Sequence, residues 1–163
     1  ERVLEGIQGD AIETRGKIRP GKSGRFGFAI RRSPDGAEKT PVWIDLEKRT
    51  LSVDISKSTL NPDARWLRWA KGRGGAPEKP DEVPENERYV TGQTAPFELA
   101  ADELVDIRIF IDRSIVEVFV NDRQCLTQRI YPSRADSMGV ALITEGSPVS
   151  VEQLQVWDMH PTQ

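Results

Sequence analysis

Short runs of alternating apolar and polar positions dominate the chain. Residues 25–31 place Phe26, Phe28 and Ile30 on one face, and residues 51–55 repeat the alternation. A period of two is typical of strands with one buried face, whereas long stretches with helical period are missing from the sequence. Several short strands separated by turn residues favour a sandwich or a barrel.

The pattern predicts strands at residues 10–18, 25–31, 42–46, 51–55, 107–112, 115–121, 124–131, 139–144 and 149–157. We therefore expect an all-β fold: a two-sheet antiparallel β-sandwich of the jelly-roll or concanavalin-like kind, with about ten strands. Between residues 57 and 96, proline and glycine interrupt the alternation repeatedly and prevent a long regular element. Strands of similar character flank this segment. We interpret it as a long loop within one domain covering residues 1–163.

The clearest region is residues 107–131, which predict a three-stranded meander. A two-residue turn at Arg113-Ser114 would set three facing pairs, Ile111 with Val116, Ile109 with Val118 and Ile107 with Val120. A second two-residue turn at Asp122-Arg123 would place Cys125 opposite Val120 and Thr127 opposite Val118. This register buries Cys125 and puts Leu126 on the other face with Phe110 and Phe119.

Charge and residue counts exclude several classes of protein. The net charge is -3, so no strong basic field exists to bind phosphate backbones, and we expect no nucleic-acid partner. No apolar run approaches the roughly 18 residues that span a bilayer, so we expect no membrane partner. With one cysteine and one histidine, Cys125 and His160, a metal site of the usual zinc, copper or haem kind is not expected, and neither is a cofactor. A single cysteine fits either redox compartment; we slightly favour a secreted or periplasmic location over a cytoplasmic one.

The meander also carries a family resemblance. The run IRIFIDRSIVEVFVND at residues 107–122 resembles the signature of the C-terminal domain of glycoside hydrolase family 32, which includes invertases, levanases and inulinases. RIYP at residues 129–132, VWDM at 156–159 and LSVDIS at 51–56 are also similar to that domain. Two features depart from the family pattern. Arg123 stands where a glycine is usual, so Asn121 or Asp122 must supply any positive φ, and the segment near residues 61–96 is longer than usual.

The resemblance implies an accessory role. In that family a five-bladed propeller carries an Asp nucleophile, a Glu acid/base and a stabilising Asp, in surroundings that read roughly Asn-Asp-Pro-Asn, Arg-Asp-Pro and Glu-Cys. None of these strings occurs in this sequence, so no catalytic residue is carried over. The implied partner is a catalytic propeller of the same parent chain that cleaves fructan or sucrose. A homo-oligomer is compatible with this reading.

Two groups of residues are candidates for chemistry or binding. Arg65, Trp66, Arg68 and Trp69 lie close together in the long loop. They suit an interface, local packing onto the sandwich, or stacking on sugar rings, the last of which would make the chain an independent fructan-binding module. Nucleic acid is the weakest alternative, because an acidic run follows directly.

Asp112 and Glu117 are the pair that a hydrolase would need, since glycoside cleavage uses two carboxyl groups about 5–10 Å apart. We expect both to be structural. Glu117 would pair with Arg108 or accept a hydrogen bond, and Asp112 would accept backbone N–H groups at its turn. Trp43 and Trp157 lie in predicted strands and are expected in the core, whereas His160 is expected to be solvated.

Overall fold

A computed structural model describes residues 1–65 and 82–160 of the chain. Eleven strands and two short helices lie in this part. The strands are β1 (Arg2–Gln8), β2 (Ala11–Arg19), β3 (Gly24–Arg32), β4 (Thr40–Asp45), β5 (Thr50–Asp54), β6 (Gly92–Pro96), β7 (Val105–Asp112), β8 (Ile115–Val120), β9 (Gln124–Arg129), β10 (Gly139–Gly146) and β11 (Ser150–Asp158). The helices are η1 (Pro62–Ala64) and α1 (Glu85–Arg88).

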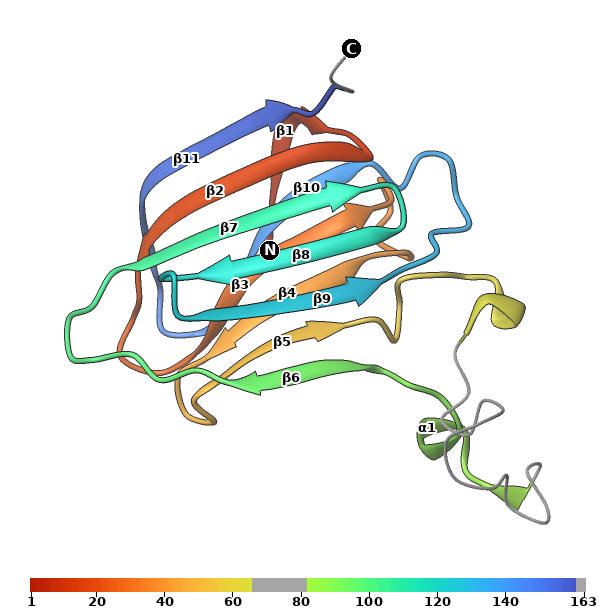
Figure 1. Ribbon diagram of the computed structural model, residues 1–163, viewed down its shortest axis with the longest axis horizontal. Coiled ribbons are helices and arrows are strands. Elements are labelled where there is room, and N and C mark those ends of the chain that lie inside the picture. Colours follow the sequence, from red (N-terminus) through yellow and green to blue (C-terminus); the bar gives the residue numbers. More distant parts are fainter. Residues whose placement is uncertain (66–81, 161–163) are drawn as a thin grey trace.

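The strands form two stacked antiparallel sheets (Figure 1). One sheet has six strands in the order β1-β10-β3-β4-β5-β6, and the other has five in the order β11-β2-β7-β8-β9. The predicted all-β sandwich is therefore confirmed. On one side of the sandwich, β9 lies against β5 and β6, so the two sheets meet there. The opposite side has β1 and β11 at the sheet edges.

The main core lies between the sheets and follows from the alternation. In β7 the side chains of Ile107, Ile109 and Ile111 are fully buried, while those between them point outward. From the other sheet, Phe26 and Phe28 enter the same cluster. Burying apolar side chains of this size contributes about 1.5–3 kcal/mol each, which holds the two layers together.

The first hairpin of the meander has the predicted register. Ile111 faces Val116, Ile109 faces Val118 and Ile107 faces Val120. The prediction for the second hairpin is wrong by one residue. Val118 faces Leu126, Phe119 faces Cys125 and Val120 faces Gln124, because the connection from Asn121 to Arg123 has three residues instead of two. Leu126 is consequently buried in the core and Cys125 is exposed.

Two strands and one tryptophan also differ from the sequence-based expectation. β1 was not predicted, and β6 lies inside the segment that was expected to be a structureless loop. Neither strand shows a clear two-residue alternation of buried and exposed positions. Trp157 is 43% exposed and does not belong to the core. Trp43 is buried, but it packs in a second, smaller cluster and not between the sheets.

Candidate functional site

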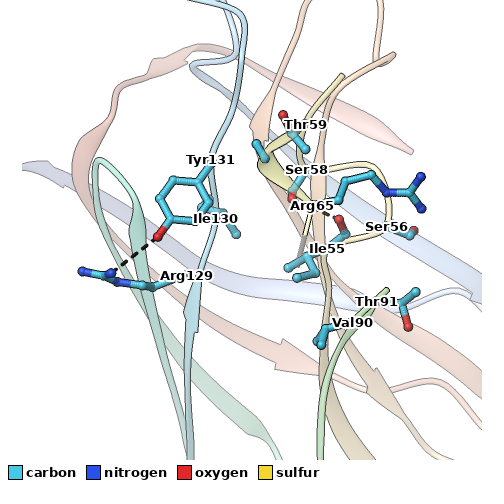
Figure 2. Close-up of a pocket in the computed structure, with 11 residues that line it drawn as sticks. Ile55, Ser56, Ser58, Thr59, Arg65, Val90, Thr91, Arg129, Ile130 and Tyr131 are labelled. Atoms are coloured by element: carbon cyan, nitrogen blue, oxygen red, sulfur yellow. Dashed lines mark hydrogen bonds between the residues drawn. The ribbon is translucent and has the colours of Figure 1, made fainter. Parts of the chain in front are cut away.

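Arg65, the one residue of the predicted cluster within the described part of the chain, lies where the chain leaves the sandwich after β5. Figure 2 shows the small cavity there, lined by Ile55, Ser56, Ser58, Thr59, Ala64, Arg65, Val90, Thr91, Arg129, Ile130 and Tyr131. Its volume is about 20 Å³, which is room for a water molecule and far too little for a sugar ring. The cavity itself is therefore not a carbohydrate pocket.

Arg65 makes a local contact. Its guanidinium carbon lies 4.1 Å from the centroid of the Tyr89 ring, a cation–π geometry that ties the start of the loop to its return. Trp66, Arg68 and Trp69 lie outside the described residues. The three alternatives for this cluster, interface, local packing and sugar stacking, remain predictions.

Asp112 and Glu117 both lie on the outer face of the five-stranded sheet. Asp112 faces Ile115 and Glu117 faces Phe110, so they project from neighbouring strands on the same side. Thr127 Oγ1 lies 3.5 Å from Glu117 Oε1, at the long limit of a hydrogen bond. The expected pairing of Glu117 with Arg108 is wrong, because Arg108 pairs with Glu13 instead. Within residues 1–65 and 82–160, no hydrogen bond to the Asp112 carboxylate is present, so the expected turn contact is also wrong.

The outer face of the five-stranded sheet exposes large aromatic side chains. Trp157 faces Glu13 across the β11–β2 pair, and Glu13 faces Phe110 across β2–β7. One row further along, Phe119 is 38% exposed and packs edge-on against Phe110, with ring centroids 5.9 Å apart. Exposed aromatic side chains that gather on one face mark interaction surfaces more often than chance exposure does. We call this surface, with Phe110, Phe119 and Trp157, the aromatic face.

Two arginines complete the aromatic face. Arg15 donates to both carboxylate oxygens of Asp106, at 2.9 and 2.6 Å, and this ion pair lowers the pKa of Asp106. The guanidinium of Arg108 is paired with Glu13 and lies 4.6 Å from the centre of the Phe110 ring. A shallow hollow of about 350 Å³ lies here, and its lining includes Arg15, Asp106, Arg108, Phe110 and Phe119. Arginine and aromatic residues are enriched in protein interfaces, where charges already paired are easier to bury.

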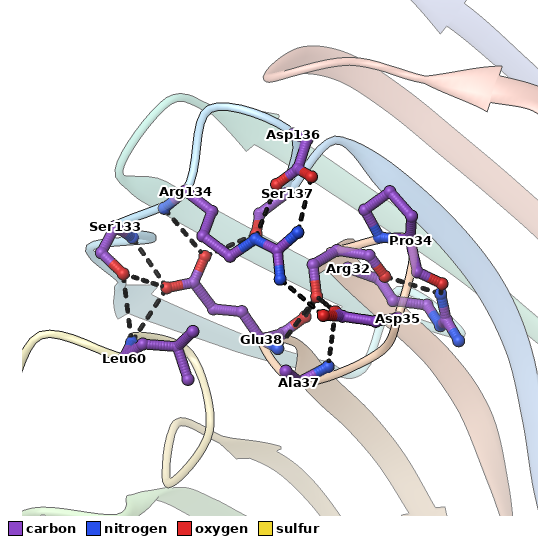
Figure 3. Close-up of polar contacts among 11 residues, drawn as sticks. Arg32, Pro34, Asp35, Ala37, Glu38, Leu60, Ser133, Arg134, Asp136 and Ser137 are labelled. Carbon is purple, nitrogen blue, oxygen red and sulfur yellow. Dashed lines mark hydrogen bonds and ion pairs between the residues drawn. The ribbon is translucent and has the colours of Figure 1, made fainter.

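A buried carboxylate that the sequence reasoning missed lies at one end of the sandwich (Figure 3). Glu38 follows β3 in the turn before β4 and is fully buried. Its Oε1 accepts hydrogen bonds from the backbone N–H of Leu60, at 2.9 Å, and from the N–H and hydroxyl of Ser133, at 2.8 and 2.6 Å. Its Oε2 accepts from the N–H of Arg134, at 3.1 Å, and from the hydroxyl of Ser137, at 2.5 Å. Glu38 thus joins three connections between strands.

The hydrogen bonds set the charge state of Glu38. Burial by itself raises the pKa of a carboxyl group, but the donors from Ser133, Ser137 and Leu60 together outweigh it and lower the pKa to about 2. The carboxylate therefore stays ionised at neutral pH and is satisfied by local donors. This arrangement suits a structural link and not a general acid, which needs a raised pKa.

No group of three or more His, Cys, Asp or Glu side chains in residues 1–65 and 82–160 has a geometry that could hold a metal ion. Within those residues, no helix is long and apolar enough to cross a membrane.

Comparisons with known proteins place the chain in a family. The model for "Glycosyl hydrolases family 32 C terminal" matches residues 2–158. The chain is 35% identical over 165 residues to a levanase of Bacillus subtilis (strain 168), covering 98% of this chain and 20% of that protein. It is 30% identical over 155 residues to fructan 1-exohydrolase w3 of Triticum aestivum, covering 88% of this chain and 22% of that protein.

Solved structures show the same fold. The crystal structure of an exo-inulinase from Aspergillus awamori superimposes with a TM-score of 0.67 and 22% identity, over 96% of this chain and 26% of that chain. The chain therefore spans about a fifth to a quarter of the length of these relatives. By the extent of the family match, the chain belongs to the C-terminal domains of glycosyl hydrolase family 32.

Proposed function

We propose that this chain is the non-catalytic accessory domain of a fructan- or sucrose-cleaving glycoside hydrolase, which packs against the catalytic propeller and supports its stability or assembly. The aromatic face carries this proposal. It offers exposed aromatic side chains beside arginines whose charges are already paired, which are the features of a surface covered by another protein domain.

The catalytic part of the same hydrolase is the occupant that we propose for the aromatic face. The relatives are four to five times longer than the region that they share with this chain, so a large domain accompanies this fold in them. A domain tethered in the same chain has a high effective concentration, and a modest interface is then enough to hold the two parts together.

The proposal that the chain performs no chemistry itself has two supports. The three acidic strings of the family's propeller are missing from the full sequence. Of the two outward carboxylates, Glu117 lies near Thr127 and Asp112 is exposed at a hairpin turn, and neither lines the cavity at Arg65 or the hollow of the aromatic face. Release of fructose by the chain alone, lost in Glu117→Gln, would overturn this part.

The docking role is tested in the parent hydrolase with the substitutions Phe119→Ser and Trp157→Ser. Phe119 is 38% exposed and Trp157 is 43% exposed, so each substitution costs the chain produced alone on the order of 1 kcal/mol in its free energy of unfolding, and the docking effect comes on top of that loss. In the full hydrolase, each loses about 2 kcal/mol of interface energy if the side chain is buried against the catalytic part. We expect the temperature of half-inactivation to fall by several degrees.

Leu60→Ser is the matched control, because Leu60 is 53% exposed but lies near the Glu38 end of the sandwich, away from the aromatic face. Equal inactivation temperatures for all three variants and the parent would refute the docking role. A dimer of the isolated chain that Phe119→Ser dissociates would assign the aromatic face to self-association instead.

A further inference from the structure

A groove crosses the outer face of the six-stranded sheet, on the side of the molecule opposite the aromatic face. Two hollows of about 390 and 300 Å³ lie there. They share four lining residues, Arg25, Trp43, Asp54 and Ser56, so they adjoin one another, and together we call them the groove. Volumes of this size are typical of sites for small organic ligands.

The floor of the groove is apolar. In β4, Val42 and Ile44 point into the main core, so Trp43 between them points outward. Trp43 packs with Ala29, Ala141 and Ile143 in the second cluster. Its partner across the β3–β4 pair is Gly27, where a Cβ would lie 2.0 Å from the carbonyl oxygen of Val42, so the two backbones can approach this closely only at a glycine.

The walls of the groove are polar and carry both signs of charge. Beside Trp43, Arg25 donates to Glu145 at 2.7 Å, while its guanidinium carbon lies 4.3 Å from the centre of the indole. On the next strand, Asp54 accepts a 2.8 Å hydrogen bond from the N–H of Ser56, which holds its carboxylate at the groove.

The far end of the larger hollow is also charge-balanced. Lys39 donates to Glu1 at 2.7 Å, and Lys57 lies nearby. The charged residues that line this hollow are Glu1, Asp54 and Glu145 on the acidic side and Arg25, Lys39 and Lys57 on the basic side. The three negative and three positive charges cancel, so the groove has no net attraction for an anion or a cation.

We propose that this groove binds a neutral sugar unit, with fructan as the natural candidate. A sugar ring has C–H groups on its faces, which can contact Ile143 and the part of Trp43 that Arg25 does not cover. Its edge carries hydroxyl groups, which donate to Asp54 and Glu145 and accept from Arg25. The balanced charges favour a neutral polyhydroxyl ligand over a phosphorylated one. The proposal rests on the proposed function only for the choice of fructan as the sugar.

The test is a calorimetric titration of levan oligosaccharides into the 163-residue chain. We expect millimolar binding, which Arg25→Gln and Asp54→Asn each weaken on the order of tenfold, because each removes a charge-assisted hydrogen bond to a sugar hydroxyl. Asp158→Asn is the matched control on β11 of the other sheet, and it should bind as the parent does. Unfolding midpoints of all variants verify that the domain is intact.

Three outcomes would overturn the sugar site: no heat at about 10 mM oligosaccharide, binding that both groove variants retain, or tighter binding of fructose 6-phosphate than of fructose. None of these bears on the docking role, which is measured through inactivation of the full hydrolase and through residues on the opposite face.

Discussion

At the scale of single residues, Glu38 has the strongest local consequences. One buried carboxylate accepts five hydrogen bonds from residues before η1 and from the connection between β9 and β10. No pattern in the sequence indicates this, because the partners Ser133 and Ser137 lie 95 and 99 positions away along the chain. A glutamate in a polar turn is ordinarily solvated, and only the tertiary fold buries this one.

The pKa of Glu38 leads to a prediction about acid stability. Its pKa falls from 4.5 to about 2 on folding, so ionised Glu38 stabilises the fold above pH 4.5, and this contribution is lost as the pH falls from 4.5 towards 2. A shift of this size corresponds to about 3 kcal/mol. We expect Glu38→Gln to lower the free energy of unfolding by about that amount at pH 7, measured by urea titration.

The difference between Glu38→Gln and the parent should shrink steadily below pH 4.5. Glu5→Gln, on the exposed surface of β1, is the matched control and should leave the free energy of unfolding unchanged across the same pH range. If the difference in free energy of unfolding between Glu38→Gln and the parent stayed constant between pH 7 and pH 3, the carboxylate charge would contribute nothing to stability.

At the scale of elements, the connection between β8 and β9 sets the register of the last meander strand. Asn121 and Asp122 have φ values of 50° and 51°, the left-handed region that asparagine and aspartate tolerate better than most residues. The Asn121 carboxamide accepts from the N–H of Asp106 at 2.7 Å and donates to Glu103 and to the carbonyl of Leu104. These contacts fix a three-residue loop.

Asn121 has two roles: its side chain makes hydrogen bonds, and its backbone adopts a positive φ. Two substitutions separate these roles. Asn121→Ala loses the side-chain hydrogen bonds and leaves at positive φ a residue that tolerates this conformation less well than asparagine, so we expect a loss of about 2–3 kcal/mol in the free energy of unfolding. Asn121→Gly loses the same bonds but tolerates the backbone conformation, so it should be less destabilised than the alanine variant. Equal stability of the alanine variant and the parent, in urea titrations, would contradict this account of the loop.

The register also predicts which side chain of β9 is reactive. Cys125 is exposed, so it should react with a thiol reagent in the native chain about as fast as in the unfolded chain. In a Cys125→Ser/Leu126→Cys variant the thiol lies at a core position, and labelling should require unfolding. If Cys125 in the native parent did not react with the thiol reagent, the two-residue turn that the sequence suggested would be the correct one.

Much of the fold could be predicted from sequence, and the failures have physical causes. The strands β7 and β8 were predicted with their register because isoleucine or valine recurs at every second position of each and their connection has the assumed length. The register of β9 was missed because loop length, and not alternation, decides it. β6 was missed since its sequence, GQTAP, contains no alternating apolar residues, and β5 holds it through backbone pairing.

The candidate sites were less predictable than the fold. The sequence drew attention to Arg65 and its neighbours, because aromatic and cationic residues adjacent in sequence are easy to notice. The aromatic face and the groove are each assembled from strands far apart in the chain, such as β2, β7 and β11 for the former. Only sheet order brings Trp157 near Phe110, so spacing along the sequence carries no signal for it.

At the scale of the whole molecule, the two outer faces have different characters and are separated by the main core. We therefore expect their functions to be independent. Phe119→Ser should leave sugar affinity unchanged, and Arg25→Gln should leave the inactivation temperature of the full hydrolase unchanged. In each of the two measurements, sugar affinity and stability of the full hydrolase, the free-energy change of the double variant should equal the sum of the changes of the two single variants to within about 0.5 kcal/mol. This additivity is expected because the sites share no contacting residues. A larger coupling energy would show that the faces communicate.

The contact of β9 with β5 and β6 has a consequence for association with other chains. Along that margin, each sheet ends against the other, and an incoming strand has little access to unpaired backbone groups. Among the described strands, β1 and β11 are the edge strands whose unpaired backbone groups are accessible. Exposed charged side chains lie on both edges, Glu152 on β11 and Arg2 and Glu5 on β1, and such charges discourage intermolecular β-pairing. Sheet extension into a neighbouring molecule is thus confined to one margin, and that margin is protected against it.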